Sequence, residues 1–116
     1  MRVGLGADAH RLVLRRPLVL GGVTIPFEKG LEGHSDGDAL LHAIADALLG
    51  GAALGDLGDH FPSDRPEWKG ISSLKILGDV GRMVKEKGYR IVNIDAVVTA
   101  QRPTLKPHLG KIREQI

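Results

Sequence analysis

The sequence has 116 residues, the size of one ordinary domain with a single hydrophobic core. It contains no cysteine, which excludes disulfides, thiolate metal sites, iron–sulfur clusters and a cysteine nucleophile. Any metal ion must therefore bind to His, Asp or Glu. Aromatic residues make up only 3%, too few for the stacking platforms that hold single-stranded nucleic acids, so we expect no nucleic-acid partner.

The first residues lack the charged-then-apolar layout of a secretory signal. Nor does any stretch contain the roughly 20 apolar residues that span a bilayer. We therefore expect a soluble, cytoplasmic protein with no membrane partner.

The net charge of +2 hides an uneven distribution along the chain. Residues 31–64 hold seven acids, three of the five histidines and no Lys or Arg, whereas residues 65–116 hold eleven basic residues against five acids. This division favours a bound cation that meets an anionic ligand such as phosphate, with uneven surface charge as the alternative.

The first half of the chain predicts short strands followed by a helix. Residues 3–6 are strand-like, and residues 18–25 predict a strand pair around a turn at Gly21-Gly22. Residues 26–37 are predicted to form a loop. A helix is then expected over residues 36–49, with Ser35 as its N-cap.

Three polar residues recur every four positions along this predicted helix. Asp38, His42 and Asp46 would form one polar stripe on an otherwise apolar helix. Such a stripe faces either water or a functional site.

The second half begins with an ordered loop over residues 50–70, which is long enough to suggest a binding role. Ser72 or Ser73 is expected to cap a second helix, which ends at Gly88. A long strand is predicted over residues 89–100, and Leu109, Ile112 and Ile116 would then share one helical face. Together these elements predict an α+β domain, a mixed β-sheet with helices packed on one face.

A metal site is suggested by three residues. Asp8 and His10 are two apart at the end of a predicted strand, so both side chains would point to the same face. His42 would add a third ligand, and three N and O ligands with one open position are typical of catalytic zinc. On spacing alone, a surface turn at Asp8-Ala9-His10 is the alternative.

Two further patterns involve anions and nucleotides. Residues 34–38 precede a predicted helix, where free backbone N–H groups favour an anion, although ordinary capping by Ser35 also explains them. Gly4-x-Gly6-x-x-Ala9 matches a relaxed dinucleotide pattern, but that pattern needs a helix directly after the glycines. Strand-like residues follow here, so we expect these glycines to allow close backbone packing. A dinucleotide-dependent oxidoreductase remains a minor alternative.

Taken together, the motifs resemble one family, the 2-C-methyl-D-erythritol 2,4-cyclodiphosphate synthases. The motifs that carry this resemblance, in order, are Gly4-x-Gly6-x-Asp8-x-His10, Leu20-Gly21-Gly22-Val23-x-Ile25-Pro26, His34-Ser35-Asp36-Gly37-Asp38 with His42, Asp46-Ala47-Leu48-Leu49-Gly50, Leu54-Gly55-Asp56-Leu57-Gly58 and Phe61-Pro62. The resemblance extends from Arg2 to beyond Pro107, and so many motifs in register are far more specific than any one of them.

The resemblance implies a metal-dependent lyase of non-mevalonate isoprenoid biosynthesis. It would convert 4-diphosphocytidyl-2-C-methyl-D-erythritol 2-phosphate to the cyclic diphosphate with release of CMP. It would act as a homotrimer with active sites between subunits. Zn²⁺ or another divalent transition metal would be one cofactor, and Mg²⁺ or Mn²⁺ bridging the substrate diphosphate the other.

The resemblance also implies roles for individual residues. Asp8, His10 and His42 would hold the zinc ion, with Asp8, Ala9 and His10 also bordering the substrate. His34 would be catalytic and, with Ser35, would contact the substrate's phosphate and erythritol portion. The substrate's hydroxyls would meet Asp56, Leu57 and Gly58. The cytidine ring would meet Ala100, Pro103, Leu105 and Lys106.

The sequence differs from the family pattern in three places. Ser63-Asp64-Arg65 stands where Asp-x-Asp is usual, and Thr104 stands where lysine is common. The family also continues for a strand, helix and strand with a Thr-x-Glu motif. We therefore expect residues 1–116 to form a single synthase-like domain that lacks this C-terminal part. The alternative function is a truncated, non-catalytic module that binds zinc and a cytidine nucleotide.

Overall fold

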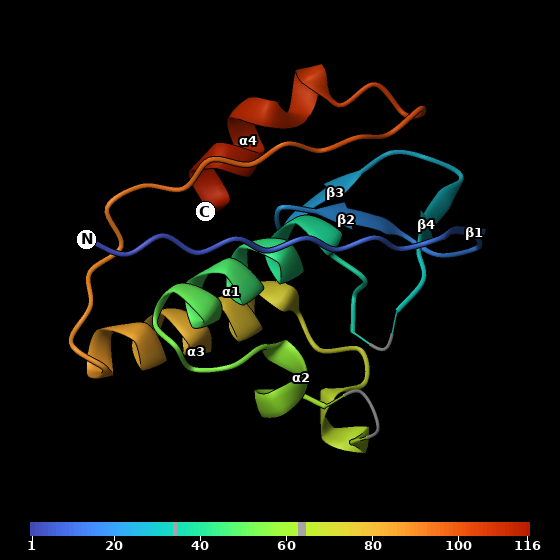
Figure 1. Cartoon of the computed structure of the whole chain (residues 1–116). Coiled ribbons are helices and arrows are strands. Elements are labelled where there is room, and N and C mark those ends of the chain that lie inside the picture. Colours follow the sequence, from blue (N-terminus) through green and yellow to red (C-terminus); the bar gives the residue numbers. More distant parts are fainter. Residues whose placement is uncertain (34, 63–64) are drawn as a thin grey trace.

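The computed structural model describes residues 1–33, 35–62 and 65–116, which form an α+β fold (Figure 1). Its described strands form two antiparallel pairs, β1 with β4 and β2 with β3. The elements are β1 (Leu12–Leu14), β2 (Leu18–Leu20), β3 (Val23–Ile25), β4 (Lys29–Leu31), α1 (Ala39–Gly51), α2 (Leu57–His60), the 3₁₀ turn η1 (Pro66–Trp68), α3 (Ser73–Glu86), the 3₁₀ turn η2 (Lys106–His108) and α4 (Leu109–Gln115).

The predicted strand pair around Gly21-Gly22 is confirmed. Strands β2 and β3 pair with Leu18 opposite Ile25, and the two glycines form the turn with φ of 61° and 77°. Positive φ at both central residues is what a two-residue hairpin turn needs to match the twist of its strands. Both Leu18 and Ile25 are buried in the core.

The pairing of β1 with β4 was not predicted, because residues 26–37 read as a loop. In the structure Val13 lies opposite Gly30. Lys29-Gly30-Leu31 has neither β-branched residues nor regular alternation, and its partner strand is distant in sequence. Only the tertiary pairing stabilises this short strand.

Helix α1 begins later than predicted, with Asp38 rather than Ser35 as its N-cap. The buried carboxylate of Asp38 accepts hydrogen bonds from the backbone N–H groups of Leu41, Gly21 and Gly22. It therefore caps the helix and holds the β2–β3 turn against it. Ser35 lies three residues earlier, and its hydroxyl approaches His42 instead.

Helix α3 confirms the second predicted helix, with Ser72 as the N-cap residue. It lies alongside α1 (Figure 1), and the buried side chains of Leu49 and Val80 belong to the core between the two helices. Helix α4 packs over the hairpin through the buried Ile112. Leu109 and Ile116, which were predicted to share its helical face, are exposed.

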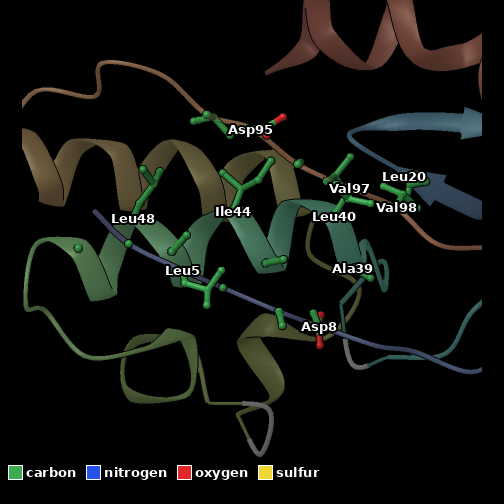
Figure 2. Close-up of a pocket in the computed structure, with 18 of the residues that line it drawn as sticks. Leu5, Asp8, Leu20, Ala39, Leu40, Ile44, Leu48, Asp95, Val97 and Val98 are labelled. Atoms are coloured by element: carbon green, nitrogen blue, oxygen red, sulfur yellow. The ribbon is translucent and has the colours of Figure 1, made fainter. Parts of the chain in front are cut away.

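The predicted mixed sheet and the predicted strand over residues 89–100 are wrong. Within the described part of the chain, residues 3–6 and 89–100 are extended but belong to no ladder. Residues of both segments line a groove over α1 (Figure 2). High β-propensity makes a segment extended, but a strand also needs a neighbouring backbone.

The long loop predicted over residues 50–70 contains short ordered pieces, α2 and η1. Among the described residues, no helix has both the length and the apolar character needed to cross a membrane.

Candidate metal centre

The side chains of Asp8 and His10 meet at the end of the extended N-terminal segment. Asp8 Oδ2 lies 2.7 Å from His10 Nε2. Although the segment belongs to no described sheet, its extended backbone keeps the period of two that places both side chains on one face.

His42 joins these two residues from the second turn of α1. Its Nδ1 atom lies 3.2 Å from the same oxygen, Asp8 Oδ2. One ligand atom from each of the three residues can be chosen so that all lie within 4.8 Å of one another. The predicted trio is therefore assembled in space.

The chemistry of these atoms suits a divalent metal ion. His10 Nδ1 lies 2.5 Å from the backbone carbonyl oxygen of Glu32, which can only accept a hydrogen bond. His10 therefore carries a hydrogen on Nδ1, and in the neutral ring Nε2 presents a lone pair towards Asp8. A carboxylate oxygen and an imidazole nitrogen this close need a proton or a metal cation between them, and one carboxylate with two imidazoles is a common zinc ligand set.

Two glycines bring the N-terminal segment onto α1. A Cβ atom on Gly4 would lie 1.8 Å from the carbonyl oxygen of Ala47, and one on Gly6 would lie 2.0 Å from that of Ala43. Because any side chain here would meet helix backbone, only glycine permits the contact that carries Asp8 and His10 to His42. The prediction that these glycines serve close packing is confirmed.

A groove of about 1060 Å³ extends from this cluster along α1. Figure 2 shows Leu5 and Asp8 on the N-terminal segment, Val97 and Val98 on the other extended segment, and Ile44 of α1 between them. Asp8 and His10 both line this groove, and the rest of its surface is mainly apolar.

Comparison with known proteins identifies the family. The model of the YgbB family matches residues 1–116. The chain belongs to the YgbB family.

Curated relatives of this YgbB chain are named 2-C-methyl-D-erythritol 2,4-cyclodiphosphate synthases. A 2-C-methyl-D-erythritol 2,4-cyclodiphosphate synthase of Clostridium perfringens is 57% identical over 100% of this chain and 74% of the relative. The synthase of Desulfosudis oleivorans is 63% identical over 93% of this chain and 64% of the relative. A solved synthase described as its CDP-bound form matches with a TM-score of 0.92 and 42% identity, over 98% of this chain and 76% of that one.

Two of the predicted substrate contacts in this YgbB chain adjoin the cluster. Ser35 is buried, and its Oγ atom lies 3.2 Å from His42 Nε2. Ala9 lies between the two N-terminal ligands and lines the groove. His34, the predicted catalytic residue, lies outside the described residues, as do Ser63 and Asp64.

The predicted hydroxyl-binding residues lie on a separate element. Asp56 is the N-cap of α2 in a reciprocal capping box with Asp59, and Leu57 and Gly58 open that helix. Capping explains Asp56 fully as a structural residue, and its substrate contact stays a prediction. Asp46 of α1 orients α2 by accepting a hydrogen bond of 2.8 Å from the backbone N–H of Leu57.

The residues predicted to hold cytidine are divided. Ala100, Pro103 and Leu105 line the groove together with Asp8 and His10. Lys106 begins the 3₁₀ turn η2 and is exposed. Their contact with a nucleotide stays a prediction.

Sequence reasoning missed the polar residues behind His42. Ser73 was considered only as a helix cap and Asp36 only as part of an anion-binding motif. In the structure Ser73 Oγ lies 2.8 Å from His42 Nε2, and Asp36 accepts two hydrogen bonds from Ser73. The proximity of Asp36 to His42 in sequence gave a weak signal, but nothing linked either residue to Ser73.

The dinucleotide alternative is not supported. The residues that follow Gly4 and Gly6 run extended into strand β1, whereas that pattern requires a helix directly after the glycines.

Proposed function

We propose that this chain catalyses the cyclisation of 4-diphosphocytidyl-2-C-methyl-D-erythritol 2-phosphate to 2-C-methyl-D-erythritol 2,4-cyclodiphosphate, with release of CMP. The observation that carries this proposal is the convergence of Asp8, His10 and His42 in a YgbB-family chain. The named relatives do not favour the alternative of a non-catalytic binding module.

The reaction needs no protein nucleophile. An oxygen of the substrate's own 2-phosphate forms a bond to the β-phosphorus, and the bond from that phosphorus to the bridging oxygen of CMP breaks, so CMP leaves with the electron pair. The protein's task is to position the two phosphates and to neutralise charge. This fits a chain that has no cysteine and that gathers acids and histidines in residues 31–64 and basic residues in residues 65–116.

Asp8, His10 and His42 would hold Zn²⁺ or another divalent transition metal. When bound, this ion supplies a Lewis acid for the β-phosphate. One carboxylate and two neutral imidazoles leave a net positive charge on a divalent centre, so the cluster attracts a phosphate group. A Mg²⁺ or Mn²⁺ ion on the substrate diphosphate is part of the proposal, but we assign it no residue of this chain.

The remaining contacts follow the family resemblance. His34 and Ser35 would contact the phosphate and erythritol portion, and the position of Ser35 beside His42 supports this placement. Asp56, Leu57 and Gly58 would bind the hydroxyls. Cytidine would meet Ala100, Pro103, Leu105 and Lys106, three of which line the same groove as Asp8.

A homotrimer with sites between subunits is also part of the proposal. This part of the proposal follows from the family resemblance. Light scattering on the purified full-length protein measures its mass, and a monomer at working concentration would contradict the trimer.

The activity is tested by phosphorus NMR. The full-length protein is incubated with the diphosphocytidyl substrate, Zn²⁺ and Mg²⁺, and we expect CMP and the cyclic diphosphate to accumulate in equal amounts. A matched reaction without protein gives the background rate. An unchanged substrate spectrum with zinc bound at one ion per chain would overturn the proposed activity.

A further inference from the structure

Ser73 and Asp36 form a closely hydrogen-bonded pair behind the metal cluster. Ser73 is the first residue of α3 and is only 1% exposed. Its hydroxyl donates to Asp36 Oδ1 at 2.5 Å, and its backbone N–H donates to Asp36 Oδ2 at 2.9 Å. Both carboxylate oxygens of Asp36 therefore hold the same serine.

The direction of this hydroxyl hydrogen bond constrains His42. A serine hydroxyl has one hydrogen, and here it points to Asp36, so Ser73 Oγ has only lone pairs left for other partners. His42 Nε2 lies 2.8 Å from this oxygen. Nε2 must then donate, so the hydrogen of the neutral imidazole lies on Nε2.

The other ring nitrogen of the neutral His42, Nδ1, consequently carries no hydrogen. Nδ1 presents a lone pair towards Asp8 Oδ2, 3.2 Å away, as His10 Nε2 does from the other side. A backbone carbonyl selects the tautomer of His10, and a carboxylate acting through a serine selects that of His42.

We infer that Asp36 and Ser73 are positioning residues of the metal centre, which hold His42 with its hydrogen on Nε2 and its Nδ1 lone pair aimed at the metal ion. This inference rests on the proposed metal centre. Residues that orient a ligating histidine through its second nitrogen affect metal affinity by about 10–100-fold. Since Ser73 begins α3, the inference also makes metal binding depend on how α3 docks on α1.

The first test needs no variant. The full-length protein, freed of metal and labelled with ¹⁵N-histidine, is held at a pH where His42 is neutral, and its tautomer is measured by long-range ¹H–¹⁵N NMR. We expect hydrogen on Nε2 and an unprotonated Nδ1. The opposite tautomer, or an even mixture, overturns the inference whether or not zinc binds.

The second test compares two adjacent serines. Ser73→Ala removes the nearer of two hydroxyl oxygens beside His42 Nε2, the other being Ser35 Oγ at 3.2 Å. We expect zinc affinity, measured by chelator competition, to fall by about 10–100-fold. Ser72→Ala is the matched control: Ser72 is exposed, and the described structure gives it no side-chain capping bond. We expect the zinc affinity of Ser72→Ala to stay within about twofold of the wild-type affinity, as for an ordinary surface substitution.

The tautomer readout separates positioning from simple destabilisation. In Ser73→Ala we expect the His42 signals to shift towards a mixture of tautomers, whereas a general loss of stability would leave them unchanged in the folded state. Equal zinc affinity in Ser73→Ala and wild type, or equal losses in both serine variants, overturns the inference. A wild type that binds no zinc contradicts the proposed metal centre instead, and the tautomer measurement then tests only whether Ser73 and Asp36 set the hydrogen of His42.

Discussion

Asp8 Oδ2 lies 3.2 Å from His42 Nδ1, so a residue near the start of the chain meets one near the start of α1. This contact depends on the extended N-terminal segment lying directly on the helix. The integrity of the proposed metal centre therefore depends on the packing of that segment.

Replacing His42 with Ala should abolish tight zinc binding, because two ligands remain where the site needs three. Metal content after dialysis against a weak chelator is the measurement. His108→Ala is a suitable control, since His108 lies at the end of η2 and outside the cluster. Stoichiometric zinc retained by His42→Ala would contradict the assignment.

Gly6→Ala should destabilise the protein by about 1–3 kcal/mol, because its Cβ would lie 2.0 Å from the carbonyl oxygen of Ala43. Since the N-terminal segment must move away from α1, zinc affinity should fall as well. Urea unfolding and chelator competition measure the two effects.

Gly78→Ala is the matched control for Gly6→Ala. Gly78 lies in α3, and a Cβ atom at this position would have no neighbouring atom within 4 Å. Alanine is a better helix former, so this variant should gain up to about 1 kcal/mol. Equal effects of the two substitutions would show that the close approach at Gly6 is unimportant.

Asp46→Ala should loosen α2, because the backbone N–H of Leu57 loses its partner. A cost of about 1 kcal/mol is expected, together with a higher KM if Asp56 and Gly58 contact substrate as proposed. Asp46→Asn keeps an acceptor oxygen and should stay close to wild type. A similar KM in both variants would argue against α2 as part of the substrate site.

The raised pKa of the buried Asp38 carboxyl predicts that the stability of the protein depends on pH. Burial raises the pKa of its carboxyl above the ordinary 3.8, although hydrogen bonds from Gly22, Gly21 and Leu41 oppose this shift. The folded state then binds the proton more tightly than the unfolded state. The contribution of Asp38 to the free energy of unfolding is therefore greatest below pH 3.8. It declines as the pH rises through the raised pKa of Asp38 in the folded state.

Asp38→Asn isolates this effect, because the amide does not titrate in that range. Urea unfolding at a series of pH values should show the stability of wild type relative to the variant declining as the pH rises through this window. A difference that is constant, or that grows with pH, would show that burial does not dominate at Asp38.

Local patterns predicted several elements correctly. The hairpin at Gly21-Gly22 follows from turn chemistry, and α3 follows from its apolar spacing and Gly88. The polar stripe of α1 also proved informative: Asp38 caps the helix, His42 lies with Asp8 and His10 in the candidate metal cluster, and Asp46 accepts a hydrogen bond from the backbone of α2. The hairpin turn, the apolar spacing of α3 and the four-residue spacing of the polar stripe depend on residues close in sequence, whose geometry the backbone dictates.

Local sequence patterns could not predict three features. These are the N-cap of α1, the β1–β4 pair and the unpaired state of residues 89–100. Asp38 replaces Ser35 as the cap because it also binds the backbone of a distant turn. Strand β4 exists because β1 lies beside it. Propensity describes one segment, whereas pairing depends on where another segment lies.

The sequence by itself determined the family and the three candidate metal ligands, because those residues occur in motifs whose order and spacing can be read along the chain. Only the tertiary structure decided that these ligands converge, that Gly4 and Gly6 bring them together, and that Ser73 and Asp36 stand behind His42. Hydrogen bonds and van der Waals contacts act over a few ångströms, and residues 31 or more positions apart reach that range only after the chain has folded.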